Sequence, residues 1–119
     1  MNGQPILLAI AALWGLLGVV FLAAGAHGVY PGILSTGGQV LLFHAATVLA
    51  LLNTQLVSGW RRAAPIALML TGSGLFALEV ALHAFTGVTA LGFLAPIGGG
   101  VTILGWLTLI IGALTQSKP

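Results

Sequence analysis

Residues 6–26 read ILLAIAALWGLLGVVFLAAGA, an apolar run without a single charged side chain. About 20 apolar residues of helix cross the hydrocarbon core of a bilayer, so this stretch predicts a membrane-spanning helix over about residues 5–27. Pro5 suits the first turn of such a helix. The small residues at the end of the run, Ala23-Ala24-Gly25-Ala26, also occur before signal-peptide cleavage sites. Because Met1-Asn2-Gly3-Gln4 carries no positive side chain and the run is long for a signal peptide, we interpret it as the first span.

The composition of the whole chain is that of a membrane protein. Hydrophobic residues make up 59% of the 119 residues and charged residues only 3%, and the mean hydropathy is +1.17. A soluble domain carries about a quarter charged residues, so this chain lacks the side chains to cover a water-facing surface. The absence of cysteine excludes disulfides, thiolate catalysis and cysteine-based metal sites. Three basic residues without interleaved aromatics indicate no nucleic-acid partner.

Three further segments are long and apolar enough to span a bilayer. We expect them at about residues 37–57, 63–85 and 96–114. The predicted fold is therefore all-α: a single domain over residues 1–119, built as an antiparallel bundle of four transmembrane helices.

Local signals place the ends of these helices. Tyr30-Pro31-Gly32 predicts a loop over residues 28–35, and Thr36-Gly37-Gly38-Gln39 resembles a capping box at the start of the second helix. Pro65 is expected in the first turn of the third helix, and Pro96 at the start of the fourth.

The basic residues predict the orientation in the membrane. With four spans, Arg61, Arg62 and Lys118 fall on the side that also holds both termini. The positive-inside rule makes this side cytoplasmic, in the inner membrane of a bacterium. Trp60 beside the two arginines is a suitable interfacial anchor.

Small residues recur every seven positions in three of the predicted helices, which keeps them on one face of a left-handed bundle. Small residues let membrane helices approach closely, so we expect these seams to be packing surfaces. They are Ala11, Gly18 and Gly25; Ala67, Gly74 and Ala81; and Gly98, Gly105 and Gly112.

Glu79 is the only acidic residue of the chain, and it lies inside a predicted span. Four residues of helix place it on the same face as His83. An ionisable group at membrane depth is a functional or assembly hypothesis. On the predicted topology the outer half of the membrane holds a polar cluster: His27, Gln39, His44, Glu79 and His83.

Three interpretations of this cluster compete. In the first, His27 is interfacial, His44 is a hydrogen-bonded core residue, and Glu79 pairs with His83 along their helix. In the second, the cluster is part of a proton or ion pathway. In the third, His27, His44 and His83 bind a metal or haem, although no histidine pair has the spacing of a helical ligand motif. We expect no metal and no cofactor.

Helix geometry adds a condition on Glu79. It lies about 160° around the helix from the seam of Ala67, Gly74 and Ala81. If that seam faces the inside of the bundle, Glu79 points outward and must meet another protein rather than lipid. Alternatively, Glu79 faces a neighbouring helix or stays protonated.

Several motifs resemble one family. They are Ala24-Gly25-Ala26-His27-Gly28, Thr36-Gly37-Gly38-Gln39 with Phe43-His44-Ala45, and the stretch from Leu91 through Pro96-Ile97-Gly98-Gly99 to Gly105-Trp106. Together they are similar to the domain-of-unknown-function 423 family, small four-helix membrane proteins that include the transmembrane protein 256 group.

The resemblance implies a four-helix membrane fold and no established activity. Any shared role would rest on His27, His44 and residues 96–99. The chain departs from the family pattern at Val40 and Leu41 and over residues 77–81, so Glu79 and His83 look particular to this protein.

No catalytic pattern stands out. The chain has no Ser/His/Asp set, Walker loop or dinucleotide fingerprint, and Gly98-Gly99-Gly100 lies at membrane depth without a nearby lysine. We therefore expect a non-catalytic accessory or stabilising subunit of a larger membrane complex, in contact with lipid and with other subunits or copies of itself. The alternative is a small oligomeric transporter or proton-conducting protein that uses the outer His/Glu cluster.

Overall fold

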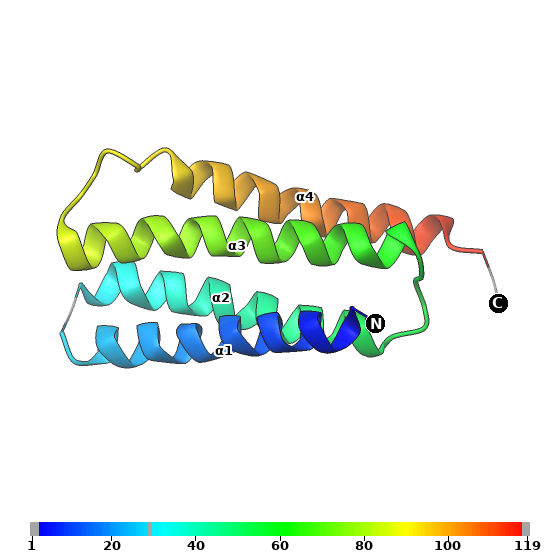
Figure 1. Cartoon of the computed structure of the whole chain (residues 1–119). Helices are drawn as coiled ribbons and strands as arrows, with labels where there is room; N and C mark the ends of the chain where they lie inside the picture. The colour runs from blue at the N-terminus through cyan, green and yellow to red at the C-terminus, as the bar shows by residue number, and fades with distance from the viewer. Residues whose placement is uncertain (1–2, 29, 118–119) are drawn as a thin grey trace.

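The computed structural model describes residues 3–28 and 30–117, which form four consecutive antiparallel helices and no strand within those ranges (Figure 1). The helices are α1 (Gln4–Ala26), α2 (Pro31–Asn53), α3 (Trp60–Thr86) and α4 (Leu94–Thr115). Each is long and apolar enough to cross a membrane. The all-α, four-helix prediction is confirmed, and the chain is that of a multi-pass membrane protein.

The start of α2 corrects the sequence prediction. This helix begins at Pro31, six residues before the expected position, and ends at Asn53 rather than residue 57. Tyr30, with a left-handed φ of 40°, turns the chain into the helix, and Pro31 takes the first helical position, where it needs no N–H partner. Thr36 lies inside the helix and its Oγ1 donates to the Gly32 carbonyl at 2.8 Å, so the proposed capping box does not exist.

The third helix also begins earlier than expected. It starts at Trp60, so Pro65 lies inside the helix rather than in its first turn. By contrast, α4 begins at Leu94 and holds Pro96 within its first turn, where the missing N–H costs no helical hydrogen bond.

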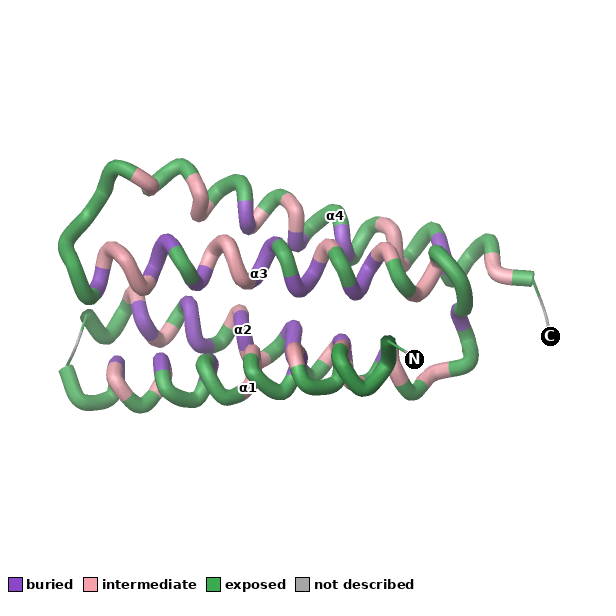
Figure 2. Tube along the Cα trace, in the orientation of Figure 1, coloured by how far each residue is buried: buried purple, intermediate pink, exposed green. Residues whose placement is uncertain are grey.

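The helices pack in a zigzag rather than a closed ring. Within the described residues, α1 packs on α2, α2 on α3, and α3 on α4, whereas α1 and α4 do not touch. Half of the most apolar stretch of α3 is buried, against 17% for α1 and 22% for α4 (Figure 2). Consequently α3 is the centre of the fold, and α1 and α4 are its outer edges.

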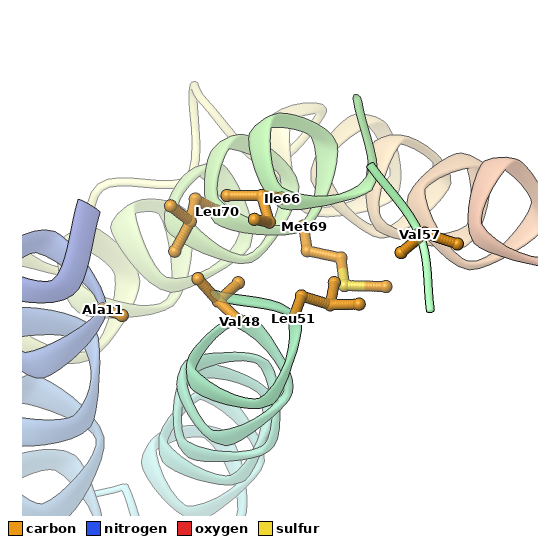
Figure 3. Close-up of a cluster of buried hydrophobic side chains, with 7 residues drawn as sticks. All are labelled: Ala11, Val48, Leu51, Val57, Ile66, Met69 and Leu70. Atoms are coloured by element: carbon orange, nitrogen blue, oxygen red, sulfur yellow. The ribbon is translucent and has the colours of Figure 1, made fainter. Parts of the chain in front are cut away.

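Two hydrophobic clusters fill the space between α1, α2 and α3. The cluster nearer the link between α2 and α3 is drawn in Figure 3 and consists of Ala11, Val48, Leu51, Val57, Ile66, Met69 and Leu70. The second, towards the opposite end, consists of Phe21, Leu34, Leu41, Ala77, Val80 and Ala84. Among the described residues α4 adds only the partly buried Leu109 to this packing, against the first cluster, so most of its contact with α3 is made in another way.

Glycines hold the helix pairs together. A β-carbon placed on Gly98 of α4 would lie 2.6 Å from the Gly72 carbonyl oxygen of α3, and one on Gly18 of α1 would lie 2.9 Å from the Gly38 carbonyl oxygen of α2. Only glycine allows backbones to approach this closely. The other buried small residues of the α1 and α4 seams are Ala11, Gly25, Gly105 and Gly112.

The seam predicted for α3 is not its contact with α4. Ala67 is exposed, and Gly74 and Ala81 are only half-buried. The helix contacts α4 through Gly72 and Phe76, which lie on the face that carries Glu79. Gly74 nevertheless faces Trp14 of α1, and Ala81 packs on the second hydrophobic cluster, so two residues of the seam do face the bundle. Glu79 still does not point outward: it is 9% exposed, and α4 packs on its side of α3.

Candidate functional site

His44 connects α2 to α4 through a tryptophan. Trp106 Nε1 donates to His44 Nε2 at 3.0 Å, and His44 Nδ1 lies 2.6 Å from the Val40 carbonyl oxygen. Because a carbonyl oxygen only accepts, this pattern assigns the proton to Nδ1 and leaves the Nε2 lone pair for the indole. In this geometry the imidazole is neutral, buried and fully hydrogen-bonded.

Trp14 makes the corresponding connection from α1 to α3. Its Nε1 lies 3.1 Å from the Leu70 carbonyl oxygen and 3.0 Å from Ser73 Oγ. Ser73 Oγ in turn donates to the Met69 carbonyl at 2.6 Å. The sequence analysis missed this residue, although a tryptophan at the middle of a span needs an acceptor for its N–H.

Glu79 lies at the contact of α3 with the beginning of α4. One helical turn separates it from Phe76, which packs against Gly98 near the start of α4. Its Oε1 is 4.0 Å from Nδ1 of His83, at the limit of an ion pair. Among the described residues the carboxyl group makes no hydrogen bond, and its oxygens keep some exposed surface.

His83 connects this carboxyl group to the surface and to the start of α2. Its side chain is 40% exposed, and its ring centre lies 6.4 Å from that of Tyr30. Tyr30 is the residue whose left-handed backbone begins α2. The link between α1 and α2 therefore contributes a side chain to the C-terminal end of α3, which spacing along the sequence did not indicate.

The five polar residues predicted to cluster do not form one site. His27 and Gln39 are exposed, and no contact joins them to His44, Glu79 or His83. Within the described residues, no three His, Asp or Glu side chains are close enough together to hold a metal ion. His44 accepts a hydrogen bond from Trp106, and His83 lies against Glu79 and Tyr30.

Comparison with known proteins places the chain in a family. The family model described as "Protein of unknown function (DUF423)" matches residues 21–99, more than half of the chain. The chain is a member of the DUF423 family. No curated protein and no solved structure matches it. The match includes His44 but neither Trp14 nor Trp106, so the connections made by the two tryptophans lie partly outside the matched residues.

An apolar groove of about 330 Å³ opens between α1 and α3 of this DUF423 protein. Gly74 and Ala81 of the predicted α3 seam border this groove, which explains why they are only half-buried. The groove lies on the opposite side of α3 from Glu79. Its lining comes from Trp14, Leu17 and Phe21 of α1, Leu41 of α2, and Gly74, Ala77, Leu78 and Ala81 of α3.

The two arginines at the other end of the bundle have different partners. Arg61 lies over the ring of Trp60 at 4.7 Å, and its Nε donates to Thr115 Oγ1 of α4 at 2.9 Å. Arg62 turns the other way, and its Nη1 donates to the Thr54 carbonyl, just after α2, at 3.0 Å. Trp60 itself is exposed, as an interfacial anchor would be.

Proposed function

We propose that this DUF423 protein is a non-catalytic accessory subunit of a larger complex in the inner membrane, with both termini in the cytoplasm. The observation that carries the proposal is the open zigzag of the helices, which leaves an apolar groove between α1 and α3. A four-helix bundle that closed on itself would bury this surface within one chain.

The chemistry of the groove suits a transmembrane helix of another subunit. Membrane helices associate by close packing, and small residues let their backbones approach. The α3 side of the groove offers Gly74, Ala77 and Ala81, whereas Trp14 and Phe21 form bulky walls on α1. A side chain such as leucine from a partner helix would fit between them.

The charge distribution supports the orientation. Arg61 and Arg62 lie at the end of the bundle where α1 begins and α4 ends (Figure 1), and Lys118 follows α4 in the sequence. Positive residues favour the cytoplasmic side of a bacterial inner membrane.

A bulky substitution in the groove tests the accessory role. Leu78→Trp fills the groove, while Leu104→Trp makes the same change on α4, away from the groove; both leucines are 49% exposed. After mild detergent extraction from cells, we expect the wild type and Leu104→Trp to migrate with a partner on native gels. Leu78→Trp should migrate alone as a folded monomer. A wild-type protein that purifies without any partner would contradict the proposal.

A second candidate function, proton or ion conduction by an oligomer, is favoured by Glu79. A carboxyl group within a membrane-spanning helix, next to the partly exposed His83, is the kind of group found in proton relays. Liposomes that contain the purified protein should then leak protons, and His83→Ala should reduce the leak several-fold. His27→Ala, at an exposed histidine with no side-chain contact, is the control. Liposomes that stay tight would exclude this function.

A further inference from the structure

A polar cavity of about 600 Å³ lies at the end of the bundle where α1 begins, α2 ends and α3 begins. This end carries the basic residues, far from Glu79 and the histidines. Most of the cavity lining is polar: Gln4, Asn53, Thr54, Gln55, Ser58 and Arg62. Such a concentration of amide, hydroxyl and guanidinium groups is unusual in a chain with 3% charged residues.

Arg62 brings a positive charge to this cavity without an anionic partner. The guanidinium group has five N–H donors, of which one binds the Thr54 carbonyl oxygen. The only acidic side chain of the protein, Glu79, lies 17 residues further along α3, about 25 Å away. Among the described residues no carboxylate pairs with Arg62, although its side chain is half-buried. A partly buried cation of this kind is stabilised by an external anion.

The surroundings of Arg62 also favour a negative charge. The cavity lies beside the first turn of α3, whose helix dipole favours a negative charge, although the backbone N–H groups of Arg61, Arg62 and Ala63 already bond to the carbonyls of Ser58 and Gly59. Amide groups of Asn53 and Gln55 and the Ser58 hydroxyl add further hydrogen-bonding groups.

An apolar surface adjoins the polar cavity. A shallow hollow that shares Gln4, Leu52 and Asn53 with it continues onto Pro5 and Leu8 of α1. A ligand seated here would therefore meet polar groups at one end and apolar side chains on the membrane side. This is the pattern of a phospholipid, with its phosphate at the interface and its acyl chains in the hydrocarbon.

We infer that this cavity binds the phosphate group of an anionic phospholipid, with Arg62 as the principal contact. Arginine pairs well with phosphate oxygens because its planar donors match their geometry. Basic pockets between membrane helices on the cytoplasmic side bind anionic headgroups in this way. The inference goes beyond the proposed accessory function and stands without it, because it concerns a different surface. Free inorganic phosphate offers the same chemistry, and the experiment separates the two sources.

Lipid binding to the full-length protein in detergent tests the inference. Native mass spectrometry would follow titrations with phosphatidylglycerol, with zwitterionic phosphatidylcholine, and with inorganic phosphate. For the wild type we expect saturable binding of one phosphatidylglycerol. Arg62→Gln should weaken that binding about tenfold, the loss expected for hydrogen bonds to a charged group.

Arg61→Gln is the matched control, because it removes the same charge one residue away. Arg61 does not line the cavity and contacts Trp60 and Thr115 instead. We expect it to keep the wild-type affinity. Equal losses in the two variants would mean general attraction to the basic end of the protein and would overturn the inference.

Two further variants guard against misfolding. Arg62→Gln also removes the hydrogen bond to Thr54, so Arg62→Lys, which keeps the charge, should retain most of the binding. Gln55→Leu changes the cavity lining without breaking a hydrogen bond in the described structure and should weaken binding modestly. Phosphatidylcholine that binds as tightly as phosphatidylglycerol, or inorganic phosphate that displaces the lipid at equal concentration, would overturn the assignment to an anionic lipid.

Discussion

The helix pairs α1–α2 and α3–α4 are built on the same plan but differ in how firmly they are held. In each pair two glycines face each other. Each outer helix also makes a tryptophan hydrogen bond across the bundle: Trp14 of α1 bonds to α3, and Trp106 of α4 bonds to α2. The glycine contact is closer in α3–α4, where a β-carbon on Gly98 would lie 2.6 Å from a carbonyl oxygen, against 2.9 Å for Gly18 in α1–α2.

The two tryptophans differ in what accepts their N–H. Trp14 binds a backbone carbonyl and the Ser73 hydroxyl, which is itself held by the Met69 carbonyl. Trp106 binds only the imidazole of His44. Lipid gives no hydrophobic force between helices, so close packing and hydrogen bonds decide where an outer helix lies. The position of α1 thus depends on several contacts with α3, whereas the cross-connection of α4 to α2 depends on one histidine.

Substitution of the glycines should give the largest effect. Gly98→Ala places a methyl group against the backbone of Gly72 and Phe76, which cannot move aside, so α3 and α4 must separate. We expect a loss of about 2 kcal/mol in the free energy of unfolding, typical of overpacking. Gly18→Ala should cost less, about 1 kcal/mol, because its contacts are slightly longer. Unfolding by titration with a denaturing detergent, followed by circular dichroism, measures both.

Gly99 supplies the control for this comparison. A β-carbon there meets nothing within 4 Å, so Gly99→Ala should not destabilise the protein and should raise its stability slightly, because alanine favours a helix more than glycine does. If Gly18→Ala destabilised the protein more than Gly98→Ala, the assignment of the tighter contact to α3–α4 would be wrong.

Substitution of the tryptophans should give smaller effects. Trp14→Phe removes the hydrogen bonds to Leu70 and Ser73 and part of the ring that packs on Gly74, and should cost about 1 kcal/mol. Trp106→Phe removes one side-chain hydrogen bond and should cost about 0.6 kcal/mol, the average for such bonds in membrane proteins. The same unfolding titration applies to both variants.

A double-mutant cycle isolates the contact between His44 and Trp106. Once Trp106→Phe has removed the donor, His44→Phe should cost about 0.6 kcal/mol less than it does in the wild type. Strictly additive losses would mean that this hydrogen bond does not tie α4 to α2.

The sequence predicted the spans well but placed the start of two helices too late. Tyr30-Pro31-Gly32 resembled a loop, yet Pro31 occupies the first position of α2, where proline is favourable. Ser58-Gly59-Trp60-Arg61-Arg62 resembled a polar connection, yet α3 starts at Trp60. In both places the proline or glycine correctly marked a helix boundary. It lies at the start of the helix rather than in the middle of a loop, because a residue that breaks a helix interior can also begin one.

Glu79 shows what local patterns cannot decide. The seven-residue spacing of Ala67, Gly74 and Ala81 suggested one packing face, and Gly74 and Ala81 do pack on Trp14 and the second hydrophobic cluster. The contact with α4 is made by Gly72 and Phe76 on another face of the helix. A helix with three neighbours buries more than one face, and the sequence does not say which neighbour lies on which face. The partners of Trp14 and Trp106, 56 or more residues away, were equally beyond prediction.

By itself, the amino-acid sequence determined that this protein has four segments able to cross a membrane. It also determined that α1 and α4 carry small residues at seven-residue intervals, and that the basic residues belong to one side of the predicted topology. These follow from local composition and spacing, because length and hydropathy decide whether a segment can reside in lipid. Only the tertiary structure decided that the bundle stays open along α1 and α3, that Glu79 faces inward, and that Arg62 rather than Arg61 lines a polar cavity. These depend on which helix faces are brought together, and that is set by close contacts between residues far apart in the chain.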